Sequence, residues 1–192
     1  MPERPPHVTK ALHEEVAIEP YDPAWPQRFE EEKRYLHECL PGDLIGRIEH
    51  FGSTAVPNLA AKPIIDMLVE VQSLEAVHRI IAPILEKRGY EYFWRPKFLG
   101  SEDIGYTWFI KRDAQGGRTH HIHMLDKRSK DWERLLFRDY LIDHPYVAKQ
   151  YEDLKRKVAE EYSQDRKAYA KAKSDFIAHV TAKARKFYGK SH

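Results

Sequence analysis

An acidic residue, Asp66, interrupts the apolar run Ile-Ile-Asp-Met-Leu-Val at residues 64–69, and a second acid, Glu70, follows before Val71. A run so rich in β-branched and aliphatic residues is typical of a central strand that is covered on both faces. A carboxylate left unpaired on such a strand would cost several kcal/mol of stability. Asp66 therefore needs a metal ion, a cation or several amide donors as its partner, and this need constrains both the fold around it and its chemistry.

Length and composition indicate one compact domain. The chain has 192 residues, of which 42% are hydrophobic and 32% charged, a profile typical of a soluble globular protein. Residues 1–14 are rich in proline and charge and are predicted to form a tail, followed by a single domain over residues 15–192. Cys39 is the one cysteine, so no disulfide can form within the chain. Since neither a signal peptide nor a bilayer-spanning run is evident, we expect a cytoplasmic protein without a membrane partner.

The hydrophobic pattern predicts an α+β fold in which strands dominate the first two thirds of the chain and helices the last. A short strand is expected over residues 16–18, a helix from about residue 26 to 40, and a second helix over 73–88 with a kink at Pro83. Further strands are predicted over residues 44–51, 63–71, 90–93, 106–111 and 119–125, the last two forming a hairpin. From residue 130 to 188 the pattern is helical, with a break at residues 143–145.

The segment between the strands over 44–51 and 63–71 has the features of a phosphate-binding turn. Gly52 lets the backbone approach a ligand, while the hydroxyl and amide groups of Ser53 and Thr54 can donate to phosphate oxygens. Asp66 on the next strand can hold a divalent metal against the same phosphates. The pattern predicts a site for nucleotidyl transfer, with a plain tight turn and an amide-bonded Asp66 as the structural alternative.

Three histidines cluster in the predicted strand Thr-His-His-Ile-His-Met at residues 119–124. Period-two alternation places His121 and His123 on one face and His120 on the other. With Asp66, the first two would form a mixed oxygen and nitrogen site, more suited to zinc, manganese or iron than to magnesium. Alternatively, these imidazoles contact phosphate, act as acid and base, or pack against neighbouring aromatic rings.

Positive charge concentrates near the C-terminus. Residues 145–192 carry 12 Lys and Arg against 6 Asp and Glu, a net charge of +6, which favours anionic ligands. The residues predicted to contact phosphate or nucleotide are Lys62, Arg138, Lys155, Arg166, Tyr169 and Lys173. Among them, Arg166, Tyr169 and Lys173 have the spacing of one helical face that would close over the pocket. The alternative is a solvated helix surface, and nucleic acid is not the expected partner because no motif for reading it accompanies the charge.

Four blocks of the sequence, in order, resemble the GrpB family: YDPAWPQRFEEE, EHFGSTAVPNLAAKPIIDMLV, FRDYLIDHPYVAKQYEDLK and AYAKAKSDFI. The resemblance extends from about residue 16 to 184. It implies a nucleotidyltransferase-like mixed β-sheet flanked by helices, with a divalent metal, Mg or Mn, bound through Asp66. Zinc or iron would be implied instead if His121 and His123 are ligands.

The sequence departs from the usual nucleotidyltransferase pattern, in which a second acid lies two residues after the first. Leu68 occupies that position, and Glu70 lies ~13 Å from Asp66 along an extended strand, too far to share an ion. Two main functions stay open. The protein either transfers a nucleotidyl or phosphoryl group to a small acceptor, or binds a phosphorylated, nucleotide-like or coenzyme-like metabolite without catalysis. A transition-metal hydrolase centred on His121 and His123 is a third hypothesis.

Overall fold

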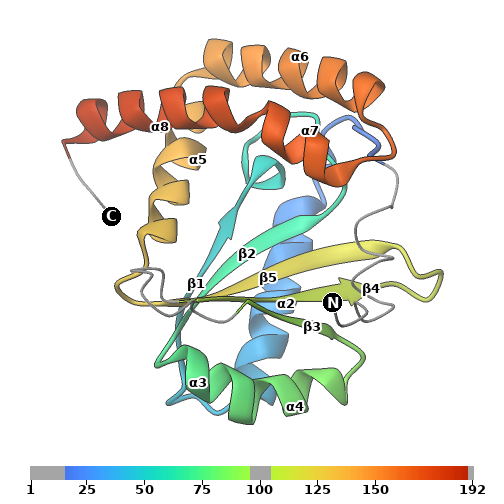
Figure 1. Ribbon diagram of the computed structural model, residues 1–192, viewed down its shortest axis with the longest axis vertical. Helices are drawn as coiled ribbons and strands as arrows, with labels where there is room; N and C mark the ends of the chain where they lie inside the picture. The colour runs from blue at the N-terminus through green and yellow to red at the C-terminus, as the bar shows by residue number, and fades with distance from the viewer. Residues whose placement is uncertain (1–15, 96–104, 190–192) are drawn as a thin grey trace, which may run out of the picture. The chain divides into compact units, whose positions relative to one another are not determined.

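The computed structural model describes residues 16–95 and 105–189, which form two compact units (Figure 1). The sheet unit comprises residues 23–55 and 64–132. The helical unit comprises residues 16–22, 56–63 and 133–189. The predicted tail, residues 1–14, lies outside the described residues, and the boundary of a single domain at residue 15 stays a prediction.

A five-stranded mixed sheet forms the centre of the sheet unit, in the order β1-β2-β5-β4-β3. The strands are β1 (Ile45–Phe51), β2 (Ile65–Val71), β3 (Glu91–Arg95), β4 (Tyr106–Arg112) and β5 (Arg118–Asp126). β2 pairs in parallel with β5, whereas the other neighbours are antiparallel. The predicted α+β class is confirmed, and the apolar run that contains Asp66 is an interior strand of the sheet, as its composition predicted.

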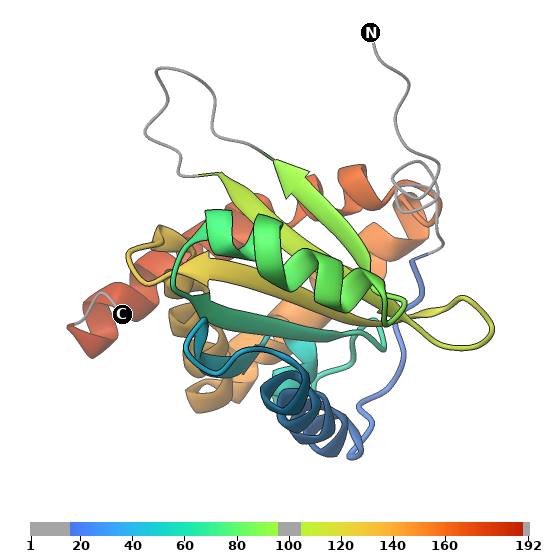
Figure 2. The same cartoon turned by 90° about the horizontal axis from the view of Figure 1, so that it is seen from below.

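Helices of the sheet unit cover one face of this sheet: α2 (Trp25–Cys39), the short α3 (Leu74–Ala76), the π-helix η2 (Val77–Ile81) and α4 (Ala82–Glu86). Figure 2 shows α3 to α4 lying across the strands. Phe29 of α2 stacks on His50 of β1, with ring centroids 4.8 Å apart. His120 belongs to the covered face and is buried, and this burial lowers its pKa. His121 and His123 belong to the opposite face, because side chains alternate along a strand.

One local prediction is wrong, and the kink at Pro83 stays a prediction. The helix over 73–88 forms as α3, η2 and α4 in direct succession, with the π-helical turn η2 just before the start of α4, where Pro83 lies. Residues 16–18 form no strand: the Val16 amide donates to the Ser163 carbonyl, and Glu19 forms an isolated bridge with Ala61.

The helical unit contains α5 (Arg134–Asp143), α6 (Pro145–Glu161), α7 (Arg166–Ala172) and α8 (Ser174–Tyr188). The predicted break is present, since α5 ends at Asp143 and α6 begins at Pro145. Its core includes Val56, Leu59, Leu141, Tyr151 and Val180, so the loop over residues 56–63 packs into this unit. Among the described residues, no helix combines the length and apolar character needed to cross a bilayer.

Candidate functional site

The turn after β1 is fixed to the start of β2 by Thr54. β1 ends at Phe51, Gly52 has a φ of +73°, and residues 53–55 form one 3-10 turn. The buried Thr54 hydroxyl donates to the Ile64 carbonyl at 3.3 Å and lies 3.0 Å from His50 Nε2, from which it accepts. The single hydrogen of this hydroxyl is used in the bond to Ile64, so the hydroxyl has no hydrogen left for a ligand. Both of its contacts hold the turn in place. The predicted contact between the Thr54 hydroxyl and a ligand does not fit this arrangement, because Thr54 is buried. Gly52 and Ser53 are partly exposed.

Asp66 lies directly against this turn. Its backbone pairs with Phe51 in the antiparallel β1–β2 ladder. A Cβ built on Gly52 would lie 3.0 Å from the Asp66 Cβ and 3.1 Å from its Cγ. The position therefore needs glycine twice, for its positive φ and for the space that the carboxylate fills. The predicted proximity of the Gly-Ser turn and Asp66 is present in the structure.

Parallel pairing of β2 with β5 brings two histidines to Asp66. Asp66 and His121 are register partners, and Leu68 is the partner of His123. Asp66 Oδ1 lies 3.3 Å from His121 Nδ1. One carboxylate oxygen and one ring nitrogen from each of His121 and His123 all lie within 4.8 Å of one another, on partly buried side chains. This set of one oxygen and two nitrogen donors fits a divalent transition metal.

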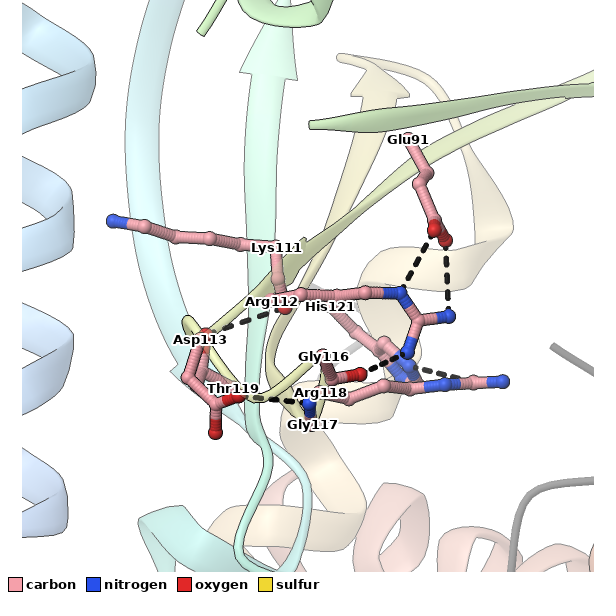
Figure 3. Close-up of polar contacts among 9 residues, drawn as sticks. All are labelled: Glu91, Lys111, Arg112, Asp113, Gly116, Gly117, Arg118, Thr119 and His121. Atoms are coloured by element: carbon pink, nitrogen blue, oxygen red, sulfur yellow. Dashed lines mark hydrogen bonds and ion pairs between the residues drawn. The ribbon is translucent and has the colours of Figure 1, made fainter. Parts of the chain in front are cut away.

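Two further side chains fix the orientation of the histidines. The Arg118 Nη1 donates to His121 Nε2 at 3.1 Å (Figure 3), and the Tyr106 hydroxyl hydrogen-bonds to His123 Nδ1. Simple alternation would place Arg118 and His121 on opposite faces of β5. Lys111 pairs with His120 while Arg112 pairs with Arg118, so β5 has one extra residue there and forms a β-bulge. The bulge shifts the alternation of side chains, which brings Arg118 to the same face as His121.

Sequence reasoning missed Arg118 and considered Tyr106 only as an aromatic side chain that packs against its neighbours or stacks on a base. The glycine-rich loop over residues 113–117 was the available signal for the first, since bulges are common beside hairpin turns.

No second acid joins Asp66 on β2. Leu68 is fully buried, and Glu70 pairs with Arg47 through an Oε2 to Nε distance of 3.3 Å. The departure from the two-carboxylate pattern is therefore real in the fold: β2 contributes a single oxygen ligand to the Asp66 cluster.

The predicted cationic residues belong to the helical unit. The Lys62 ammonium lies 5.2 Å and the Lys173 ammonium 3.9 Å from the ring centroid of Tyr169, which is buried. Arg166 and Tyr169 lie on α7, but Lys173 follows it, between α7 and α8. The three residues therefore do not share one continuous helical face as predicted, although Lys173 still contacts Tyr169. Arg138 lies on α5, where its Nε donates to Asp139.

Lys155 has a structural position. It is 2% exposed, and its ammonium donates to the Ala60 carbonyl, while Glu152 accepts from the Ala60 amide at 3.0 Å. Burial, together with the charges of Arg156 and Lys62, lowers the pKa of Lys155 to about 7, whereas the Glu152 charge opposes this shift. The predicted phosphate contact by Lys155 does not fit this burial. Glu152 and Lys155 instead hold both sides of Ala60 and so fix the loop that carries Lys62.

The sequence model of the GrpB protein family matches residues 15–183. The chain belongs to the GrpB family. The crystal structure of a GrpB from Enterococcus faecalis superimposes with a TM-score of 0.76 at 36% identity and covers 91% of this chain and 100% of that one.

Among GrpB relatives, the UPF0157 protein PA4798 of Pseudomonas aeruginosa is 39% identical over 92% of this chain and 70% of its own length. The glutamate-rich protein GrpB of Alkalihalophilus pseudofirmus is 34% identical over 86% of this chain and 94% of its own length. A dephospho-CoA kinase of Mycolicibacterium paratuberculosis is 29% identical over 84% of this chain but only 44% of the kinase.

Proposed function

We propose that this GrpB protein binds a divalent metal through Asp66, His121 and His123, and transfers a nucleotidyl or phosphoryl group to a small acceptor. The observation that carries the proposal is the convergence of three ligand atoms within 4.8 Å on one face of the sheet, directly beside the Gly52 turn. A metal bound there would supply positive charge against the phosphate oxygens of the substrate.

The donor set favours a particular group of metals. Imidazole nitrogen suits zinc, manganese and iron, whereas magnesium prefers oxygen ligands and a nearly complete octahedron. With Leu68 in place of a second acid, the site offers one carboxylate. We therefore expect Mn²⁺ or Zn²⁺ to bind more tightly than Mg²⁺.

The residues of the turn have different roles in this proposal. Gly52 leaves the space that the Asp66 carboxylate occupies, and Ser53 supplies its hydroxyl and amide as donors to a phosphate. Thr54 keeps the turn in register with β2 through its bond to Ile64. The phosphate contacts predicted for Lys62, Arg138, Arg166 and Lys173 stay predictions, and they concern the helical unit.

Calorimetric titration with Mn²⁺ and Zn²⁺, followed by incubation with radiolabelled nucleoside triphosphates, tests the proposal. Asp66→Asn should lower metal affinity at least tenfold. Glu70→Gln is the matched control, because Glu70 lies on the same strand and face and contacts Arg47; its metal affinity should match the unchanged protein. If the unchanged protein binds neither Mn²⁺ nor Zn²⁺, the proposal is wrong.

The single carboxylate also supports a second function, a binding module for a phosphorylated or nucleotide-like metabolite. Similarity to part of a dephospho-CoA kinase makes a coenzyme-like ligand the first choice of probe. Binding of dephospho-coenzyme A that survives chelation and is unchanged in Asp66→Asn, without turnover of any triphosphate, would favour this function over transfer.

A further inference from the structure

Both ring nitrogens of His121 are engaged, and the partners fix which one carries hydrogen. Nε2 lies 3.1 Å from the Arg118 Nη1, and Nδ1 lies 3.3 Å from Asp66 Oδ1 (Figure 3 shows the first contact). A guanidinium group has donors and no acceptor. Nε2 must therefore accept from Arg118, so in a neutral ring Nδ1 carries the hydrogen and faces the Asp66 carboxylate.

His121 cannot bind a metal while Arg118 donates to its Nε2. A neutral imidazole has one nitrogen with an available lone pair. If a metal takes Nδ1 beside Asp66, the hydrogen moves to Nε2 and opposes the N–H groups of Arg118. If the metal takes Nε2 instead, it occupies the position to which Arg118 now donates. In both cases Arg118 has to leave His121 when the metal binds.

We propose that Arg118 is an anion-binding residue of the metal-loaded site and is held by His121 until the metal arrives. This inference rests on the proposed metal site. The released guanidinium stays attached to β5 beside Asp66 and His121, and its planar set of donors matches two phosphate oxygens. The ligand class is an anion with a phosphate or diphosphate group, which binds after the metal.

The hairpin that carries Arg118 is well suited to hold its backbone while the side chain moves. Arg112, the register partner of Arg118, donates to both Glu91 oxygens at 2.8 and 3.1 Å and to the Gly116 carbonyl. The Asp113 carboxylate accepts from the Gly117 amide at 2.8 Å, and Figure 3 shows how these contacts close the turn. Arg112 and Arg118 thus lie opposite each other. Arg112 is fixed to the Glu91 carboxylate, whereas Arg118 contacts His121, a candidate metal ligand.

The test measures two affinities with opposite expected changes. Arg118→Met should bind Mn²⁺ about tenfold more tightly than the unchanged protein, because the competing cation is gone. The Mn²⁺-loaded variant should bind inorganic pyrophosphate about tenfold more weakly, because the contact between the Arg118 guanidinium and the phosphate oxygens is lost. Arg128→Met, which removes an exposed arginine just after β5, is the control, and we expect it to leave both affinities within about twofold. Arg118→Lys, which keeps the charge without the planar group, should restore part of the pyrophosphate affinity.

The outcomes separate this inference from the proposed function. If the unchanged protein binds neither Mn²⁺ nor Zn²⁺, both are wrong; if it binds only Zn²⁺, the same titrations are made with Zn²⁺. If it binds Mn²⁺ and Arg118→Met, folded by circular dichroism, binds Mn²⁺ equally or less tightly, the competition is wrong while the metal site stands. Unchanged pyrophosphate binding in Arg118→Met would likewise overturn the anion-binding role alone.

Discussion

The Asp66 carboxyl group occupies the space that a side chain on Gly52 would need. A Cβ on Gly52 would lie 3.0 Å from the Asp66 Cβ, and the backbone φ of +73° is itself unfavourable for any other residue. The two residues join the end of β1 to the start of β2. The position of the carboxylate therefore depends on the absence of a side chain fourteen residues earlier.

Gly52→Ala should lower both stability and metal affinity. We expect the free energy of unfolding to fall by at least about 1 kcal/mol from the positive φ, and Mn²⁺ affinity to fall about tenfold because Asp66 is displaced. Gly89→Ala is the control: Gly89 has a φ of +85° with no atom within 4 Å of its Cβ position. It should lose stability without losing metal affinity. Equal metal affinity in both variants would show that Asp66 tolerates the added methyl group.

Tyr106→Phe should weaken metal binding without unfolding the protein. The variant keeps the ring packing against Trp108 and His123 but loses the hydroxyl that fixes His123 at Nδ1. Loss of such an orienting partner typically costs 10–100-fold in metal affinity, which calorimetry measures. Tyr92→Phe is the matched control, because it removes a hydroxyl that lies 3.4 Å from the Nδ1 of another histidine, His78. Its metal affinity should not change. A similar loss in both variants would point to a general packing effect.

Lys155 should make stability increase with pH above neutrality. Its pKa is lowered by burial to about 7 in the folded protein, from an ordinary value of 10.5. Between these values the unfolded chain binds more protons, so the free energy of unfolding rises with pH. Urea denaturation between about pH 7 and 8 samples this range below the ordinary ionisation of cysteine and tyrosine. In Lys155→Met the rise should disappear, whereas in Lys157→Met, on the exposed side of α6, it should persist. A rise of the same size in Lys155→Met would contradict this assignment.

Lys62 and Lys173 should contribute to anion binding if the predicted phosphate contacts are correct. Both ammonium groups lie over the Tyr169 ring, so the loss of one charge leaves the other in place. Each single substitution to Met should weaken pyrophosphate binding about three- to tenfold, and more strongly at low salt. Lys183→Met, an exposed residue of α8, controls for the change in net charge. Binding that is equal in all three variants would remove these lysines from the list of phosphate contacts.

The strand that carries Asp66 and the alternation of the histidines could be predicted because both depend on local rules. An apolar β-branched run favours an interior strand, and period-two alternation separates His120 from His121. The break between α5 and α6 follows from Pro145, which cannot continue the preceding helix. The register of β2 against β5 could not be predicted from local rules, because it depends on which strands become neighbours in the sheet.

The amino-acid sequence by itself determined the five strands of the sheet, the glycine turn and the residue types of the candidate site, since each follows from the preferences of a few neighbouring residues. Only the tertiary structure decided that the Arg118 guanidinium reaches His121 and that Lys155 is buried against Ala60. Both depend on long-range packing: a bulge changes the phase of β5, and α6 encloses a loop about ninety residues earlier in the chain. Such contacts are set by the free energy of the whole fold, which no short segment of sequence specifies.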